Sequence, residues 1–319
     1  MNSQLGTVFL VVLPVFFVAI LGVLIRRFNW LNQNADESLL KVTVNLLAPC
    51  LILDSILQNR ALKEPANLFI PPLVGFGTVV IGMILSWYVA KIFRLGERKV
   101  MGTFALCTGL FNYGYVPIPL ARELFGKETV GVLMVHNVGV EISMWSAGIL
   151  LLAGHTEGKA LKKIFNAPVM AILIGLPINY FWGDRFIPAF VQGTIHMLAA
   201  CAIPMGLLLI GATVADYLHD FHSATGWRVM FYSCLLRLLV LPLMMLLLAR
   251  YLPFTIELKR VIVLQAAMPS AVFPIVMARH YGGDASTSLR VVIGTSAIGF
   301  LTIPLWINFG LHWILPNSF

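Results

Sequence analysis

Two ionisable side chains lie near the centre of long apolar stretches: Glu141 within residues 129–153 and Arg237 within residues 227–250. A charge at the middle of a membrane span costs about 2.5–3.5 kcal/mol on insertion scales, so it needs a functional or structural reason. A functional interpretation makes Glu141 a proton acceptor in proton-coupled transport and Arg237 the bidentate partner of a substrate carboxylate. Alternatively, Glu141 and Arg237 pair with each other, and the sequence leaves both interpretations open.

Asn137 precedes Glu141 by one helical turn, so the two side chains share one face of the expected helix. This spacing makes Asn137 a second candidate for proton coupling. The adjacent His136 is expected to point away from both side chains. We therefore treat Glu141 and Asn137 as one polar group.

The apolar stretch from Leu106 to Lys127 is long enough to cross a bilayer but cannot form one regular helix. Pro117 lacks the amide that would bond the carbonyl of Tyr113, and glycines loosen the same turns. We predict two half-helices joined by an unwound segment between Asn112 and Pro117. Free carbonyl groups at membrane depth are tolerated only beside protein or a water-filled cavity, so this break is a candidate binding site.

The first unwound segment supplies four candidate substrate contacts: Asn112, Tyr113, Gly114 and Pro117. The Asn112 amide can donate to a carboxylate, and the start of the following half-helix has a dipole that favours an anion. In the competing interpretation, Asn112 only satisfies the carbonyls that Pro117 leaves free.

A second interrupted span, Ala266 to Asp284, aligns with the first at one constant offset and without a gap. Pro274 falls on Pro117, whereas Pro269 stands where the first segment has Asn112. Discontinuous spans at corresponding positions of two halves are the best sequence indication of a secondary transporter's site.

The second unwound segment adds Gln265, Pro269, Ser270 and Pro274 as candidates. Pro269 leaves the carbonyl of Gln265 without its helical partner, and Pro274 does the same to Ser270. The side chains of Gln265 and Ser270 could contact substrate or repair the backbone, and the sequence does not decide between these roles.

The composition is that of an integral membrane protein. Of 319 residues, 59% are hydrophobic and 11% are charged, whereas a soluble domain carries about 25% charged residues. The net charge of +8 does not indicate a nucleic-acid partner, because the basic residues lie in short links between apolar stretches. The sequence lacks HExxH, GxSxG, CxxC and phosphate-loop patterns, so we expect no enzyme, no cofactor and no metal site.

Ten membrane spans account for the hydropathy pattern. The odd-numbered links hold thirteen Lys and Arg residues and the even-numbered links eight, which places the odd links in the cytoplasm and both termini outside. The expected spans are residues 5–25, 38–57, 68–90, 100–124, 129–153, 165–182, 190–215, 227–250, 258–280 and 289–315.

Because five spans per half is an odd number, the second half must enter the membrane in the opposite orientation. We therefore predict an all-α integral membrane protein built as an inverted 5+5 repeat, in which helices four and nine are broken and cross. The first five-helix repeat covers residues 1–153, a cytoplasmic link covers 154–164, and the second, inverted repeat covers 165–319.

These features, with the NLLAP segment at residues 45–49, resemble the auxin efflux carrier family, whose bacterial members include malonate and other carboxylate permeases. The resemblance covers essentially the whole chain. It implies a fold like that of bile-acid/sodium symporters, with crossing spans four and nine in a mobile transport domain. Spans one, two, six and seven would form a scaffold that often makes a dimer contact. It also implies an anionic organic substrate and an elevator-type motion.

One departure limits what the resemblance implies. The plant carriers have an asparagine–proline pattern at each crossover, and this sequence keeps Asn112 but has Pro269 and Ser270 in the ninth span. The resemblance therefore does not carry a substrate contact over to the second crossover, and auxin itself is not implied.

We accordingly expect a secondary active transporter of a small organic anion, a mono- or dicarboxylate, working by alternating access in the plasma (inner) membrane. Its expected partners are the anion, H⁺ or Na⁺ as coupling ion, the lipid bilayer and a second copy of the chain, with no nucleic acid. Two alternatives remain: sodium-coupled symport through carbonyls near Gln265 to Pro274, and a sensor or passive channel on the same fold.

Overall fold

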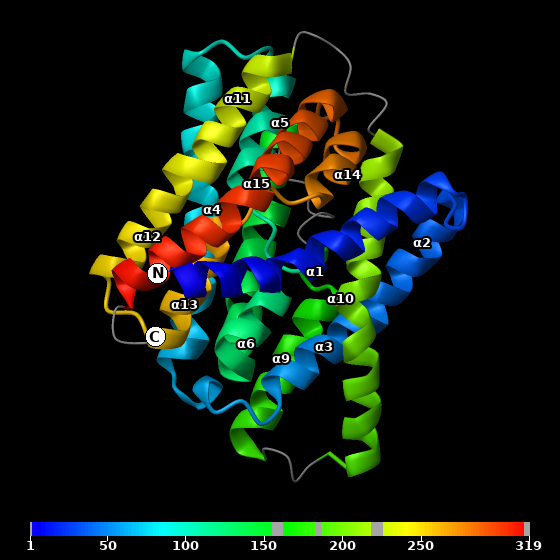
Figure 1. The fold of residues 1–319 in the computed structure, drawn as a ribbon, viewed down its shortest axis with the longest axis vertical. Helices are drawn as coiled ribbons and strands as arrows, with labels where there is room; N and C mark the ends of the chain where they lie inside the picture. The colour runs from blue at the N-terminus through cyan, green and yellow to red at the C-terminus, as the bar shows by residue number, and fades with distance from the viewer. Residues whose placement is uncertain (1, 155–161, 183–186, 218–225, 316–319) are drawn as a thin grey trace.

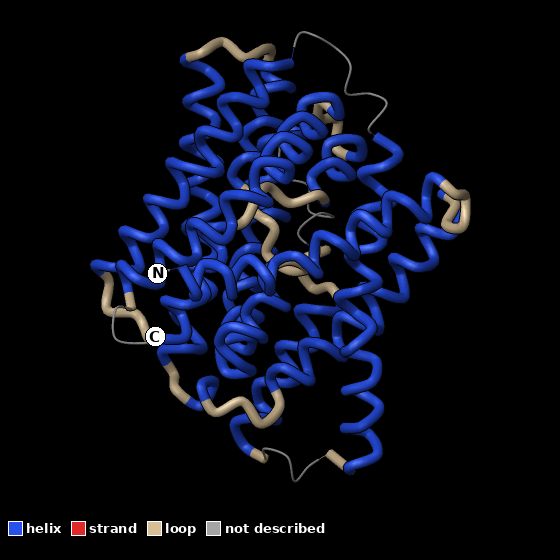
Figure 2. Tube along the Cα trace, viewed as in Figure 1, coloured by secondary structure: helices blue, strands red, loops and turns tan. Residues whose placement is uncertain are grey.

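The computed structural model describes residues 2–154, 162–182, 187–217 and 226–315. Within these ranges the chain is helical, with loops and one isolated β-bridge (Figure 2). Seven helical segments there are long and apolar enough to cross a membrane, and the apolar helix Ala167–Phe181 is shorter. The prediction of an all-helical, multi-pass membrane protein is confirmed at this level, while the number of ten spans stays a prediction.

The first half of the chain runs from blue to green in Figure 1 and contains the first unwound segment, between α5 and α6. Its helices are α1 (Asn2–Arg27), α2 (Gln33–Val42), η1 (Thr43–Leu47), α3 (Ala48–Ile56), η2 (Ala61–Lys63), α4 (Ala66–Ile92), α5 (Arg98–Gly109), α6 (Pro117–Ser143), η3 (Met144–Gly148) and α7 (Ile149–Ala153).

The second half runs from green to red in the same view. Its helices are α9 (Ala167–Phe181), α10 (Ala189–Tyr217), α11 (Trp227–Leu235), η6 (Leu236–Val240), α12 (Leu241–Tyr251), α13 (Ile256–Ala267), α14 (Phe273–His280) and α15 (Ala285–Ile314).

Both predicted interruptions are present. Helix α5 ends at Gly109 and α6 begins at Pro117, while α13 ends at Ala267 and α14 begins at Phe273. Proline is tolerated in the first turn of a helix, where its missing amide would have no partner anyway. Pro117 opens α6 in this way, and Pro274 lies in the first turn of α14.

Helix α6 is itself divided at Gly126, whose φ of 80° and ψ of −176° are not helical. A residue with a side chain adopts this region only with strain, so glycine is required here. The bend separates the half-helix that starts at Pro117 from the longer helix that carries Glu141. It coincides with the expected link between residues 124 and 129.

Three of the long helices contain a π-helical turn, η1, η3 and η6, a feature often found near functional sites. Pro242 follows η6 and removes the amide that would bond the carbonyl of Leu238. The indole Nε1 of Trp306 on α15 donates to that carbonyl at 2.7 Å. A side chain from another helix thus replaces the lost backbone bond.

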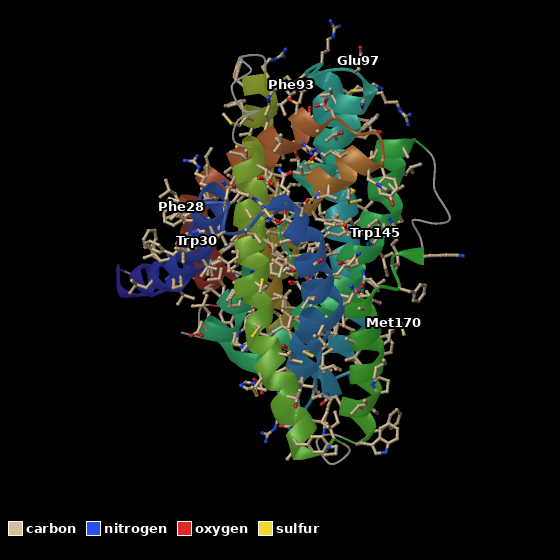
Figure 3. The ribbon with its side chains drawn as sticks, turned by 90° about the vertical axis from the view of Figure 1, so that its right-hand side faces the viewer. Phe28, Trp30, Phe93, Glu97, Trp145 and Met170 are labelled. Carbon is tan, nitrogen blue, oxygen red and sulfur yellow. The ribbon has the colours of Figure 1, made fainter. Side chains whose placement is uncertain are left out.

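The helices pack in two groups. In the first group, α10 contacts α1 and α3, and α3 contacts α9. In the second, α4 packs against α5 and α6, and α13 joins α6 to α12 and α15 (Figure 1). Contacts of α1 with α15 and of α3 with α6 connect the groups. Large apolar side chains are exposed on the outer surface, among them Phe28 and Trp30 in the α1–α2 turn (Figure 3), as lipid contact requires.

Candidate functional site

The two unwound segments lie side by side and pair through their backbones. Phe111 and Ser270 form an antiparallel bridge, although they are far apart in the sequence. The amide of Asn112 donates to the carbonyl of Pro269 at 2.8 Å, and the amide of Ala271 donates to the carbonyl of Leu110 at 3.0 Å. Each segment therefore satisfies backbone groups of the other where a helix cannot.

The carbonyl of Tyr113, which Pro117 deprives of its helical partner, accepts bonds from two side chains. Asn137 Nδ2 donates to it at 2.7 Å and Gln265 Nε2 at 3.4 Å. Gln265 Nε2 also lies 3.2 Å from Asn137 Oδ1, so the two amides form a network. The donors to this carbonyl are thus Asn137 and Gln265 and not Asn112, whose Oδ1 accepts from the amide of Gly114 at 3.4 Å.

Glu141 is held by three neutral donors. Tyr113 Oη donates to Oε1 at 2.7 Å, while Trp145 Nε1 and Asn166 Nδ2 donate to Oε2 at 3.0 and 3.2 Å. The first unwound segment is thereby bonded directly to the carboxyl group that was predicted to carry protons. Among the described residues Glu141 has no cationic partner, and in particular it does not pair with Arg237.

Arg237 lies on η6, only 1% exposed, and reaches both unwound regions from the other side. Its Nη2 is 3.4 Å from the carbonyl of Ala266 at the end of α13, and its guanidinium lies 5.2 Å from the ring centroid of Phe111. Arginine stacks readily on aromatic faces, so this contact stabilises Phe111 and, with it, the backbone pairing of the two segments.

A cavity of about 520 Å³ lies beside the paired segments. Five of the predicted site residues line it: Asn112, Tyr113, Gly114, Asn137 and Glu141. Apolar side chains of α3, α6, α9, α10 and α14 form most of the remaining wall. The other predicted site residues, which shape the segments without lining the cavity, are Pro117, Gln265, Pro269, Ser270, Pro274 and Arg237.

The prediction that His136 points away from Asn137 was wrong. Its Nδ1 lies 3.5 Å from Asn137 Oδ1, and its ring centroid is 6.3 Å from that of Phe111. The reason is that Asn137 turns back toward the unwound segment, which brings its amide oxygen within reach of the neighbouring ring.

Sequence analysis missed five polar residues of the cavity: Tyr115, Trp145, Lys163, Asn166 and Thr213. Trp145 follows Glu141 by one helical turn, and this spacing alone could have identified it. Asn166 is the N-cap of α9, accepting from the amide of Val169 at 3.0 Å while donating to Glu141. No sequence signal connects Lys163 with the cavity.

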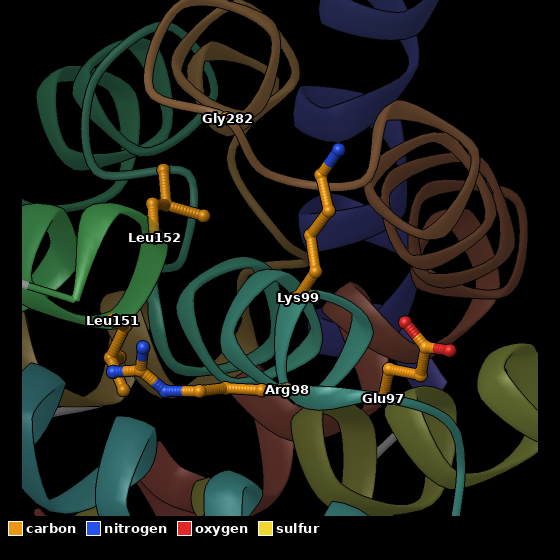
Figure 4. A pocket seen from close by; sticks show the side chains of 6 residues that line it. All are labelled: Glu97, Arg98, Lys99, Leu151, Leu152 and Gly282. Carbon is orange, nitrogen blue, oxygen red and sulfur yellow. The ribbon is translucent and has the colours of Figure 1, made fainter.

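A second cavity, of about 420 Å³, lies at the start of α5 (Figure 4). It is lined by Glu97, Arg98, Lys99, Leu151, Leu152 and Gly282, none of which belongs to the unwound segments. The cavity beside the paired segments is therefore the candidate site.

Comparison with known proteins identifies the family to which the chain is similar. The sequence matches the sequence model of a family described as "Membrane transport protein" over residues 7–161 and 156–307. The chain is 26% identical to an uncharacterized transporter of Methanothermobacter thermautotrophicus over 299 residues, covering 92% of this chain and 96% of the relative. It is 23% identical to an uncharacterized transporter of Methanocaldococcus jannaschii over 313 residues, covering 96% of this chain and 98% of the relative.

Proposed function

Because the chain belongs to the family of membrane transport proteins, we propose that it is a secondary active transporter of a small organic anion, working by alternating access. One observation carries the proposal: the backbone pairing of two interrupted helices forms a wall of a cavity that also contains Glu141. Unwound backbone at membrane depth is characteristic of transporter binding sites.

The substrate would bind at the first unwound segment. Asn112, Tyr113 and Gly114 face the cavity, and α6 begins just beyond them, so its N-terminal dipole favours an anion there. Pro117, Pro269 and the network of Gln265 act indirectly, by holding the segments in shape. The largely apolar wall suits the organic part of the anion.

Proton coupling is favoured over sodium coupling. Glu141 lines the cavity and is bonded to Tyr113, so a change in its protonation acts directly on the first unwound segment. The carbonyl of Pro269, a candidate sodium ligand, already accepts a hydrogen bond from the amide of Asn112, which leaves it one lone pair. Asn137 connects the same region to Gln265.

The proposed architecture is the inverted 5+5 arrangement of ten spans, with crossing helices four and nine. Residues 1–153 would form the first repeat, 154–164 the cytoplasmic link and 165–319 the second repeat. The two matches to the family's sequence model meet at residues 156–161, inside this link, which supports the division. Residues 155–161 lie outside the described part of the chain.

An elevator-type motion would move the group of helices around α4, α5, α6 and α13 against α1, α3, α9 and α10. One polar contact across this boundary is the pair of Arg122 Nη2 and Asp54 Oδ2, at 3.2 Å. Arg122 is partly exposed, so the pair contributes roughly 0–1 kcal/mol and would not prevent sliding. We further propose a plasma-membrane homodimer with both termini outside the cytoplasm.

A thermal-shift screen of the purified protein against small carboxylates tests the proposal, followed by uptake of the stabilising compounds into proteoliposomes. Binding by the native state raises the melting temperature by mass action. We expect saturable carboxylate uptake that follows a pH gradient and ignores a sodium gradient. Sodium dependence would favour the symporter alternative, and non-saturable flux would favour a channel. Binding without any flux would favour a sensor.

A further inference from the structure

Lys163 lies near the end of the link of residues 154–164, before α9, and lines the cavity beside Trp145. Its Nζ donates to the hydroxyl of Tyr281 at 2.9 Å. The same ammonium lies 5.2 Å from the ring centroid of Trp145 and 5.3 Å from that of Tyr281. The ring of Trp145, by cation–π contact, and the hydroxyl of Tyr281, by a hydrogen bond, thus hold the charge.

Lys163 has no ion-pair partner among the described residues. Of the side chains that line the cavity, Lys163 and Glu141 carry the charges. Both oxygens of Glu141 are engaged by neutral donors, one of which is the indole of Trp145. An aromatic ring and a hydroxyl position an ammonium without neutralising it, so Lys163 brings to the cavity a cation that is not directly paired with an acid among the described residues.

We infer that Lys163 is the residue that pairs with the anionic group of the substrate. The inference rests on the proposed function and gives Lys163 the role that the sequence suggested for Arg237. An ammonium has three donors, and Tyr281 takes one, which leaves two for a carboxylate. Arg237 cannot take this role where it lies, because it does not line the cavity.

The surroundings of Lys163 make it a selective partner. Its side chain is exposed and stands on a connecting segment, so it can turn from Tyr281 to an arriving anion without breaking a helix. Trp145 bonds to Glu141 on one side and faces the ammonium on the other. An anion bound by Lys163 therefore lies next to the group proposed to carry the proton.

The test compares the affinity for each carboxylate with that for its neutral amide. The two ligands have similar shapes, so a residue that binds the negative charge affects only the carboxylate. The probes are acetate, malonate and phenylacetate, with acetamide, malonamide and phenylacetamide as their partners, and apparent affinities come from thermal-shift titrations. The variants are Lys163→Gln, which can still donate to Tyr281, and Lys163→Arg, which keeps the charge. Lys162→Gln is the matched control, because Lys162 is adjacent but does not line the cavity.

The wild type should prefer a carboxylate to its amide. Lys163→Gln should weaken carboxylate binding about tenfold and leave amide binding within about twofold, since a charge-assisted bond is lost. Lys163→Arg and Lys162→Gln should retain the preference. The inference is overturned if Lys163→Gln keeps the wild-type ratio of carboxylate affinity to amide affinity, or if Lys162→Gln loses as much carboxylate affinity as Lys163→Gln. Either result leaves the proposed function standing. A wild type that binds none of the carboxylates overturns the proposed function and the inference with it.

Discussion

The hydroxyl of Tyr113 donates a 2.7 Å hydrogen bond to the carboxyl group of Glu141, which joins the first unwound segment to the acid at the centre of the neighbouring helix. The carbonyl of the same tyrosine is held by Asn137 and Gln265. One residue thus connects the candidate substrate segment with the candidate proton carrier and with the second interrupted helix.

Tyr113→Phe removes only the hydroxyl and should uncouple the segment from Glu141. We expect carboxylate uptake to persist at a lower rate and to lose most of its dependence on the pH gradient, because the proton no longer acts on the segment. Initial uptake rates at several imposed gradients measure this. Tyr88→Phe is the control, because Tyr88 is exposed and does not line the cavity. Full retention of the pH dependence would contradict the role assigned to Tyr113.

Gln265→Leu and Asn137→Leu should each destabilise the protein, because each removes one of two donors to the carbonyl of Tyr113 and leaves the remaining amide without its partner. An unsatisfied buried polar group costs about 1–3 kcal/mol, which should appear as a lower melting temperature in detergent. The double variant should lose less stability than the sum of the two single losses, since the amides also bond to each other. Strict additivity would argue against a shared network.

Arg237→Met should leave carboxylate selectivity intact. The guanidinium contacts Phe111 and the carbonyl of Ala266 but does not line the cavity. Any change in affinity should therefore affect a carboxylate and its amide equally, through the shape of the unwound segments. The ratio of the two affinities is the measurement. A selective loss of carboxylate binding would instead restore Arg237 as the anion's partner.

Gly139→Ala should strongly destabilise the packing of α6 against α4. A methyl group at Gly139 would fall on the carbonyl oxygen of Pro72, and the backbone there cannot move aside. Overpacking of this kind costs about 1–3 kcal/mol. Gly77→Ala on α4 is the matched control, because nothing lies within 4 Å of the added atom, and alanine is the better helix former. Equal melting temperatures for the two variants would contradict the close approach of α6 to α4 at Gly139.

The interruptions could be predicted because their cause is local. A proline removes its own amide, so Pro117 and Pro274 indicate where a helix must stop regardless of the surroundings. The alignment of the two stretches indicated that the breaks belong together. These signals depend only on residues near each other in the sequence.

The partners of the freed groups could not be predicted, because they come from distant parts of the chain. Gln265 was a candidate for repairing its own segment, yet it bonds to the carbonyl of Tyr113 in the other. The insertion cost of Arg237 showed that it needs a partner but not which one, and its guanidinium contacts the ring of Phe111 and the carbonyl of Ala266. Lys163 was counted only as an orienting charge in a link.

The most direct test of the account is carboxylate uptake by Glu141→Gln in proteoliposomes, compared with the wild type. The amide keeps the size of the side chain and removes the proton site. We predict that the wild type concentrates a carboxylate when a pH gradient is imposed, whereas Glu141→Gln only exchanges labelled for unlabelled carboxylate across the membrane. Concentrative, pH-driven uptake by Glu141→Gln at the wild-type rate would contradict the account.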